Sequence, residues 1–283
     1  MNAGQQLLLG WEALWRSARQ MRSIDVWIPG LVVALVQVGI LAALAWFAHP
    51  AVSWFMAPIL RRVAGEEVLR YPNVFQVMPA LYGHAGLIVE ALIGATMAGA
   101  TVWLFARRFE GRPATASAGL AHALRRALPL VIASLPGTLL IDLVLTASDR
   151  WLVDHGGPRL VRHAIHYGAV GVALLVQAFF LYVVAYVVLE GRGVLGAWGG
   201  LPEAARRGFW GALFVSCVLY LPHLPGDLIG RLAPVIVQRG RPELVTGLVG
   251  MEIVIGLLTN LLLAGGAALL FLSAVTDESA EGA

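Results

Sequence analysis

Six long apolar runs constrain this chain more than any other feature of its sequence. A helix that crosses a bilayer needs about 20 mostly apolar residues, because the hydrocarbon core is about 30 Å thick and offers the backbone no hydrogen-bonding partner. Such spans are predicted over residues 26–48, 85–106, 127–147, 167–189, 208–226 and 244–275. The composition agrees, because 59% of the residues are hydrophobic and 13% are charged. We therefore expect an all-α polytopic membrane protein whose residues 1–283 form a single integral membrane domain.

The distribution of basic residues predicts the orientation of these spans. An even number of spans places both termini on one side of the membrane. All 20 basic residues are Arg, and slightly more than half of them fall on the side of the termini. Because positively charged loops tend to stay in the cytoplasm, we expect a multi-pass protein of an inner membrane with both termini in the cytoplasm.

One short phrase occurs three times, each time just before an odd-numbered span. It reads GWEALWRSA at residues 10–18, GLAHALRRA at 119–127 and GLPEAARRG at 200–208. Apolar residues recur at helical spacing around the first copy. The pattern predicts a three-fold repeat of one interfacial amphipathic helix followed by two spans.

In this interpretation each glycine turns the chain and each arginine sets the depth of the helix that follows. The arginines could contact lipid headgroups or a protein partner. They could also serve only as anchors for the helix ends. The predicted contact residues are Arg16, Arg125, Arg126, Arg206 and Arg207.

Acidic residues near the spans are the second functional signal. A carboxylate at the bilayer centre costs about 3 kcal/mol and is by default a functional hypothesis. The candidates are Glu90, Asp142 and Glu252 within the spans and Asp227 just beyond the fifth. The first three fall in the predicted outer half of the membrane, where they could line an outward-facing polar cavity that exchanges protons or binds a cation. They could equally reach headgroups or pair with arginines, without any transport.

A basic stripe precedes the fourth span. It consists of Arg159, Arg162, His163 and His166, which share one helical face by their spacing. The stripe could bind a phosphate headgroup or an acidic partner, or it could simply be a solvated face. We expect no metal site here, because no zinc-binding signature surrounds these histidines.

Small residues and Pro-Gly pairs accompany the spans. Residues four apart that let helices approach closely are Gly94 with Ala98, Ala95 with Gly99, and Ala264 with Ala268. Pro-Gly pairs occur in the first, third and fifth spans, at residues 29–30, 136–137 and 225–226. Proline removes a helical hydrogen bond, so these pairs indicate either a broken helix at a binding site or tolerated irregularity.

Several functions are excluded by missing motifs. Residues 191–196 read GRGVLG, but a long apolar span precedes them instead of a strand, so we expect no nucleotide site and read these glycines as a helix end. The chain lacks H-E-x-x-H, G-x-S-x-G and C-x-x-C. Its few charges lie on both membrane faces, which disfavours nucleic acid. We therefore expect no enzymatic activity and no cofactor.

Residues 186–214 carry a family resemblance. A span ends there in the turn Glu190-Gly191, an arginine-bearing segment containing Arg206 and Arg207 follows, and the next span begins with Phe209 and Trp210. This stretch resembles the membrane module of bacterial six-helix proteins such as the membrane domain fused to some glycerophosphodiester phosphodiesterases. A second match consists of Glu110, Gly111, Arg125 and Arg126.

The resemblance implies a six-helix architecture in a bacterial inner membrane. It does not imply phosphodiesterase activity, because the chain has no room for the catalytic barrel. We expect a non-enzymatic scaffold, accessory subunit or lipid-interacting protein, with membrane lipids and a protein partner or a second copy as its partners. The alternative is a permease or permease subunit for an ion, a lipid or a small solute.

Overall fold

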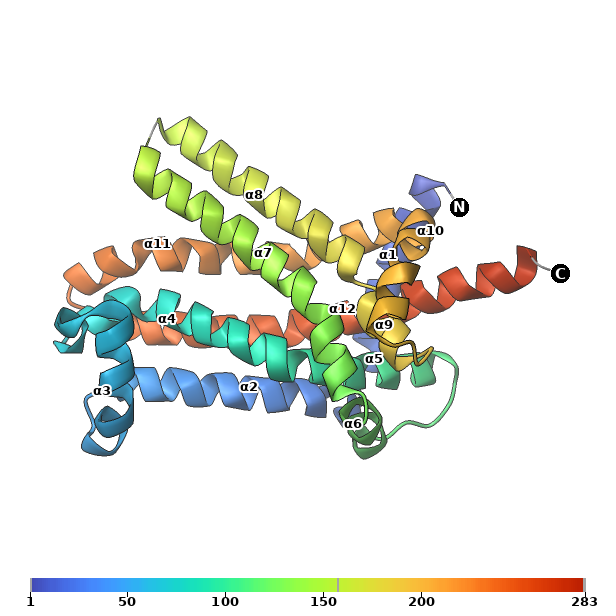
Figure 1. Cartoon of the computed structure of the whole chain (residues 1–283), viewed down its shortest axis with the longest axis horizontal. Coiled ribbons are helices and arrows are strands. Elements are labelled where there is room, and N and C mark those ends of the chain that lie inside the picture. Colours follow the sequence, from blue (N-terminus) through green and yellow to red (C-terminus); the bar gives the residue numbers. More distant parts are fainter. Residues whose placement is uncertain (1, 157, 282–283) are drawn as a thin grey trace. The chain divides into compact units, whose positions relative to one another are not determined.

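The computed structural model describes residues 2–156 and 158–281, with side chains given outside residues 153, 159, 227–231 and 275–281 (Figure 1). In this part of the chain every regular element is helical. The elements are α1 (Ala3–Gln20), α2 (Ile24–Ala45), α3 (Pro50–Ala64), η1 (Glu66–Leu69), α4 (Asn73–Val89), η2 (Glu90–Gly94), α5 (Ala95–Phe109), α6 (Ala116–Leu124), α7 (Ala127–His155), α8 (Arg159–Phe180), α9 (Val183–Val188), α10 (Val194–Tyr220), η3 (Leu221–His223), α11 (Leu224–Gln238) and α12 (Glu243–Glu281).

Within the described residues, six helical segments are long and apolar enough to cross a membrane, which confirms the predicted all-α polytopic fold. They are Ile24–Ala45, Asn73–Phe109, Ala127–Leu152, Leu160–Val188, Val194–Gly226 and Glu243–Ala274. The second segment begins earlier than predicted because α4, η2 and α5 follow one another without a loop. The fifth also begins earlier, because α10 runs on through the third copy of the repeated phrase.

The three copies of the phrase therefore differ in structure. The first copy lies in α1, a separate helix before α2, and the second lies in the short helix α6 and the turn after it. The third copy is the middle of α10, in which Ala197, Leu201 and Ala204 are buried at helical spacing. This buried face stabilises a continuous helix where the sequence predicted a break between an interfacial helix and a span.

The chain divides into two compact units, a division that the prediction of a single domain did not include. Unit 1 comprises residues Met1–Gly30, Ala91–Leu219 and Asn260–Ala283. Unit 2 comprises Leu31–Glu90 and Tyr220–Thr259. Each unit thus combines segments that are distant in the sequence, and each is described by itself below.

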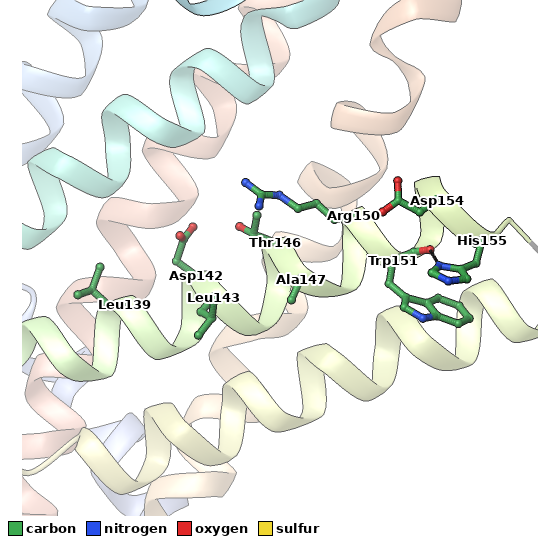
Figure 2. A pocket seen from close by; sticks show the side chains of 9 residues that line it. All are labelled: Leu139, Asp142, Leu143, Thr146, Ala147, Arg150, Trp151, Asp154 and His155. Atoms are coloured by element: carbon green, nitrogen blue, oxygen red, sulfur yellow. Dashed lines mark hydrogen bonds between the residues drawn. The ribbon is translucent and has the colours of Figure 1, made fainter.

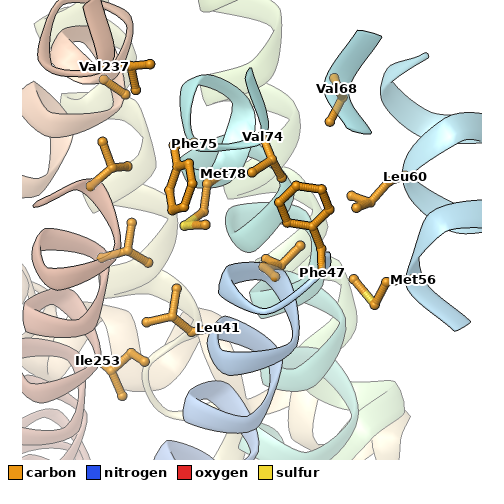
Figure 3. Close-up of a cluster of buried hydrophobic side chains, with 14 residues drawn as sticks. Leu41, Phe47, Met56, Leu60, Val68, Val74, Phe75, Met78, Val237 and Ile253 are labelled. Carbon is orange, nitrogen blue, oxygen red and sulfur yellow. The ribbon is translucent and has the colours of Figure 1, made fainter. Parts of the chain in front are cut away.

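Unit 2 is built around a cluster of buried apolar side chains (Figure 3). The cluster draws on α2, α3, η1, α4, α11 and α12, with Val74 and Met78 fully buried at its centre. Figure 3 shows Phe47 between the side chains of α3 and those of α4. In a membrane the lipid tails are as apolar as these residues, so close packing, more than exclusion from water, holds such helices together.

Unit 1 depends on glycines at helix crossings. A Cβ built on Gly10 of α1 would lie 2.9 Å from the carbonyl oxygen of Gly211 in α10. A Cβ on Gly99 of α5 would lie 2.7 Å from a methyl carbon of Leu130 in α7. The close packing that the small residues predicted is therefore found at Gly99, and Ala95, Ala264 and Ala268 are also buried.

Unit 1 also contains an ion pair near the start of α2. Asp25 accepts a hydrogen bond from the backbone N–H of Ala116 at 3.0 Å. Its second carboxylate oxygen lies 3.2 Å from Nη2 of Arg108, which also donates to the carbonyl oxygen of Ala114. The pair joins α2, the end of α5 and the first turn of α6, where an anion is favoured by the unpaired N–H groups of a helix start.

Candidate functional site

The glycines that open the repeated phrase pack against neighbouring helices and do not turn the chain. Besides Gly10, a Cβ on Gly119 would lie 2.9 Å from Leu104, and one on Gly200 would lie 2.6 Å from the ring of Tyr186. All three lie within helices, so the prediction that they turn the chain is wrong. The turns are made instead by Gly111 and Gly191, whose φ angles are 71° and 73°. The prediction that glycine ends the helix before residue 192 is thereby confirmed.

Three of the five predicted headgroup arginines contact their own chain. Arg126 donates from Nη1 to the carbonyl oxygens of Val187 at 2.5 Å and Val188 at 3.3 Å. Arg207 donates to Glu203 at 3.1 Å and to the carbonyl oxygen of Ala274 at 3.3 Å. Arg16 forms an ion pair of 2.5 Å with Glu12, one helical turn away. The guanidinium groups that were predicted to contact lipid or a partner therefore form hydrogen bonds or ion pairs within the chain.

The other two arginines, Arg125 and Arg206, are exposed. Among the described residues neither of their side chains forms an ion pair. Arg206 stands at a groove of about 590 Å³ on unit 1. The groove is lined by Ala3, Gln6, Phe179, Pro202, Ala205, Arg206, Phe209 and Trp210.

The walls of this groove come from α1, α8 and α10. Gln6 of α1 is buried, and its side-chain oxygen accepts a hydrogen bond from the backbone N–H of Trp210 at 3.0 Å. The rings of Phe209 and Trp210 meet edge to face at 5.8 Å. The arrangement combines an apolar, largely aromatic surface with one exposed guanidinium, which suits an amphiphilic anion.

Asp142 lies on a second groove of unit 1, which runs along α7 and measures about 610 Å³ (Figure 2). Figure 2 shows Asp142, Thr146, Arg150 and Asp154 along one side of the helix. On the other side the rings of Trp151 and His155 stack at 4.7 Å, toward α8. Asp142 thus belongs to a different unit from Glu90 and Glu252, so the structure does not gather the three predicted acids in one unit.

The predicted basic stripe lies on α8, which begins at Arg159. The side chain of Arg159 lies outside the described residues. Arg162 and His163 are exposed, and His166 is partly buried with its ring against the edge of Tyr167 at 5.3 Å. Among the described side chains, no three His, Cys, Asp or Glu residues are grouped closely enough to hold a metal ion.

Unit 2 contains a polar cluster around Glu252. His223 of η3 approaches Oε2 of Glu252 through Nδ1 at 3.1 Å and Oγ1 of Thr259 through Nε2 at 2.9 Å. Both glutamates, Glu90 and Glu252, act electrostatically on the phenol of Tyr82 in α4. All five residues lie in segments that are long and apolar enough to span a membrane. The side chain of the fourth predicted acid, Asp227, lies outside the described residues.

Glu252 sits against a glycine. A Cβ built on Gly226 of α11 would overlap the carboxylate of Glu252, so any larger residue would displace it. Oε1 of Glu252 is buried and has no hydrogen-bonding partner in the described part of the chain. Glu90 opens the π-helical turn η2, a widened turn of a kind that is frequent at functional sites.

Sequence reasoning missed the grouping of His223, Thr259 and Tyr82 with the acids. His223 lies near the end of the predicted fifth span, and no motif links it to the acids. The Pro225-Gly226 pair was a usable signal, because Gly226 provides the space that the carboxylate of Glu252 occupies. Thr259 lies in an apolar run and carries no sequence signal of its own.

The fold and this intramembrane polar cluster define an all-α polytopic membrane protein. Comparison of the chain with protein-family models, with curated proteins and with solved structures finds no match.

Proposed function

We propose that the protein is a non-enzymatic component of a bacterial inner membrane that binds an anionic lipid in the groove beside Arg206. The observation that carries this proposal is an exposed guanidinium at the rim of an apolar, aromatic groove of about 590 Å³. The groove accepts acyl chains on Phe179, Phe209 and Trp210. The guanidinium of Arg206 can donate two parallel hydrogen bonds to a phosphate.

The exposed apolar side chains of α1 indicate where the groove lies relative to the membrane surface. Ala3 and Gln6 of α1 line it, while Leu8 and Trp11 of the same helix are 72% and 59% exposed. An amphipathic helix with large apolar side chains exposed is suited to lie in the membrane interface. We propose that α1 lies there on the cytoplasmic side, which would place Arg206 at the level of the lipid phosphates.

Two further proposals follow from the sequence. Arg125, which is exposed, is a contact for lipid or for a protein partner. The resemblance of residues 186–214 supports a shared six-helix module with the membrane domains fused to glycerophosphodiester phosphodiesterases.

The alternative function is a permease or permease subunit. It is favoured by a separate observation, the polar cluster of Glu252 and His223 within the spanning segments of unit 2.

Replacing Arg206 with Gln is expected to weaken the binding of phosphatidylglycerol about tenfold, because one charge-assisted contact is worth roughly 1.5 kcal/mol. The measurement is native mass spectrometry of the full-length protein in detergent with added phosphatidylglycerol. Arg62→Gln is the matched control, since it removes an exposed arginine that does not line the groove.

A second variant tests the groove itself. Ala205→Phe leaves Arg206 in place but fills the groove, and it should also lower phosphatidylglycerol binding. Arg206→Lys keeps the charge without the two-pronged geometry and should retain part of the binding. Equal binding by the wild type, Arg206→Gln and Ala205→Phe would refute the proposed lipid site.

A further inference from the structure

The polar cluster of unit 2 is a short chain of hydrogen bonds with a histidine at its centre. His223 lies between Glu252, 3.1 Å from Nδ1, and Thr259, 2.9 Å from Nε2. The hydroxyl of Thr259 also lies 2.9 Å from the carbonyl oxygen of Ile255, to which it donates. Glu252 and Thr259 share α12, whereas His223 comes from η3.

The hydrogen atoms shared by Thr259, His223 and Glu252 can be counted. Thr259 has one hydroxyl hydrogen, which is used at Ile255, so its oxygen accepts the hydrogen on Nε2 of His223. Nδ1 then faces Oε2 of Glu252, and two lone pairs would meet there unless a proton lies between them. The pair therefore holds one proton, either as imidazolium and carboxylate or as imidazole and carboxylic acid.

A turn of the Thr259 hydroxyl accounts for the state without this proton. If the hydroxyl donates to Nε2 instead of to Ile255, His223 carries its single hydrogen on Nδ1 and donates it to an ionised Glu252. The cluster then contains one proton fewer, which has left to the solvent, and it carries one net negative charge. The two states differ by one proton and by the direction of one hydroxyl.

The surroundings favour the state with the proton. The cluster lies in spanning segments, where a net charge is costly. Oε1 of Glu252 is buried without a hydrogen-bonding partner among the described residues. Other titratable groups near the cluster in the described part of the chain include Tyr82 of α4, on whose phenol Glu252 acts, and Glu90 of η2, which acts on the same phenol.

We propose that His223, Glu252 and Thr259 form a binding site for one exchangeable proton within the membrane-spanning part of unit 2. Gly226 keeps the carboxylate in place, because it offers the space that a Cβ would take. This site shares no residue with the groove at Arg206, so the lipid proposal and the proton proposal stand or fall separately.

The test counts protons in the intact protein. The full-length chain is reconstituted in vesicles of phosphatidylethanolamine and phosphatidylglycerol that contain an uncoupler. Proton uptake between about pH 9 and about pH 5 is then measured with an indicator dye. We expect Glu252→Gln to take up about one proton fewer per chain than the wild type, and His223→Gln to lose the same amount.

The double variant tests the proposal most directly. Because the two side chains share one proton, Glu252→Gln combined with His223→Gln should also lose about one proton, not two. Glu243→Gln is the control, since this exposed carboxylate accepts a hydrogen bond from Tyr71 and takes no part in the cluster, so the count should not change. A loss of about two in the double variant, or no loss in either single variant, overturns the proposal. If one single variant does not fold, the other carries the same expectation.

Discussion

Replacing Gly211 with Ala is expected to lower the free energy of unfolding by about 3 kcal/mol, at the upper end of the cost of overpacking. The new Cβ would lie 2.8 Å from the carbonyl oxygen of Gln6 and 3.1 Å from a methyl carbon of Leu270. The Leu270 side chain can rotate away, but the Gln6 carbonyl is part of the backbone of α1. The helix α1 must therefore move as a whole, which weakens its contact with α10.

The same helix provides the control. Gly199 also lies within α10, and a Cβ there would have no atom within 4 Å. Gly199→Ala should be neutral or should stabilise the protein by up to about 1 kcal/mol, because alanine favours a helix more than glycine does. Thermal unfolding of both variants in the same detergent measures the difference. Equal destabilisation of the two would contradict the close approach of α1 and α10.

Replacing Arg126 with Gln should lower the free energy of unfolding by about 2–3 kcal/mol, because hydrogen bonds to a charged group are worth about 1.5–3 kcal/mol. Arg126 donates to the carbonyl oxygens of Val187 and Val188, in the last residues of α9. These carbonyls have no partner within their own helix, and a cation there also suits the negative end of the helix dipole.

Its neighbour in the sequence is the matched control. Arg125 is exposed, and Arg125→Gln should change the stability by less than about 0.5 kcal/mol, as is usual for surface positions. The two variants carry the same substitution one residue apart, so unfolding in the same detergent isolates the contact with α9. If both variants unfold alike, or if Arg125→Gln is the less stable one, the proposed contribution of the hydrogen bonds from Arg126 to α9 is wrong.

The positions of the spans could be predicted because they depend on a local property, the length of an apolar run. The different contacts of Arg125 and Arg126 could not be predicted from a local property. Both occupy the same repeated phrase, and only the carbonyl groups at the end of α9, some 60 residues later, decide which of them forms hydrogen bonds within the chain. The continuity of α10 was missed for the same reason, because the buried face of Leu201 and Ala204 depends on neighbouring helices.

The candidate site was predictable only in part. The cost of a carboxylate inside the bilayer identified Glu90 and Glu252 without any knowledge of the fold. Their partners were not predictable, because His223 and Thr259 are 36 residues apart and no helical period links them. The same reasoning proposed Asp142 for the same cavity, and the structure places Asp142 in the other unit.

The contact between α1 and α10 has a consequence for how the protein is made. The side-chain oxygen of Gln6 accepts a hydrogen bond from the backbone N–H of Trp210, which is translated 204 residues after Gln6. At a translation rate of about 5–20 residues per second, α10 is synthesised roughly 10–40 s after α1. During this interval the surface that α1 packs against is absent. An amphipathic helix is suited to this interval, because it can rest on the membrane surface until α10 is inserted and the bundle closes around it.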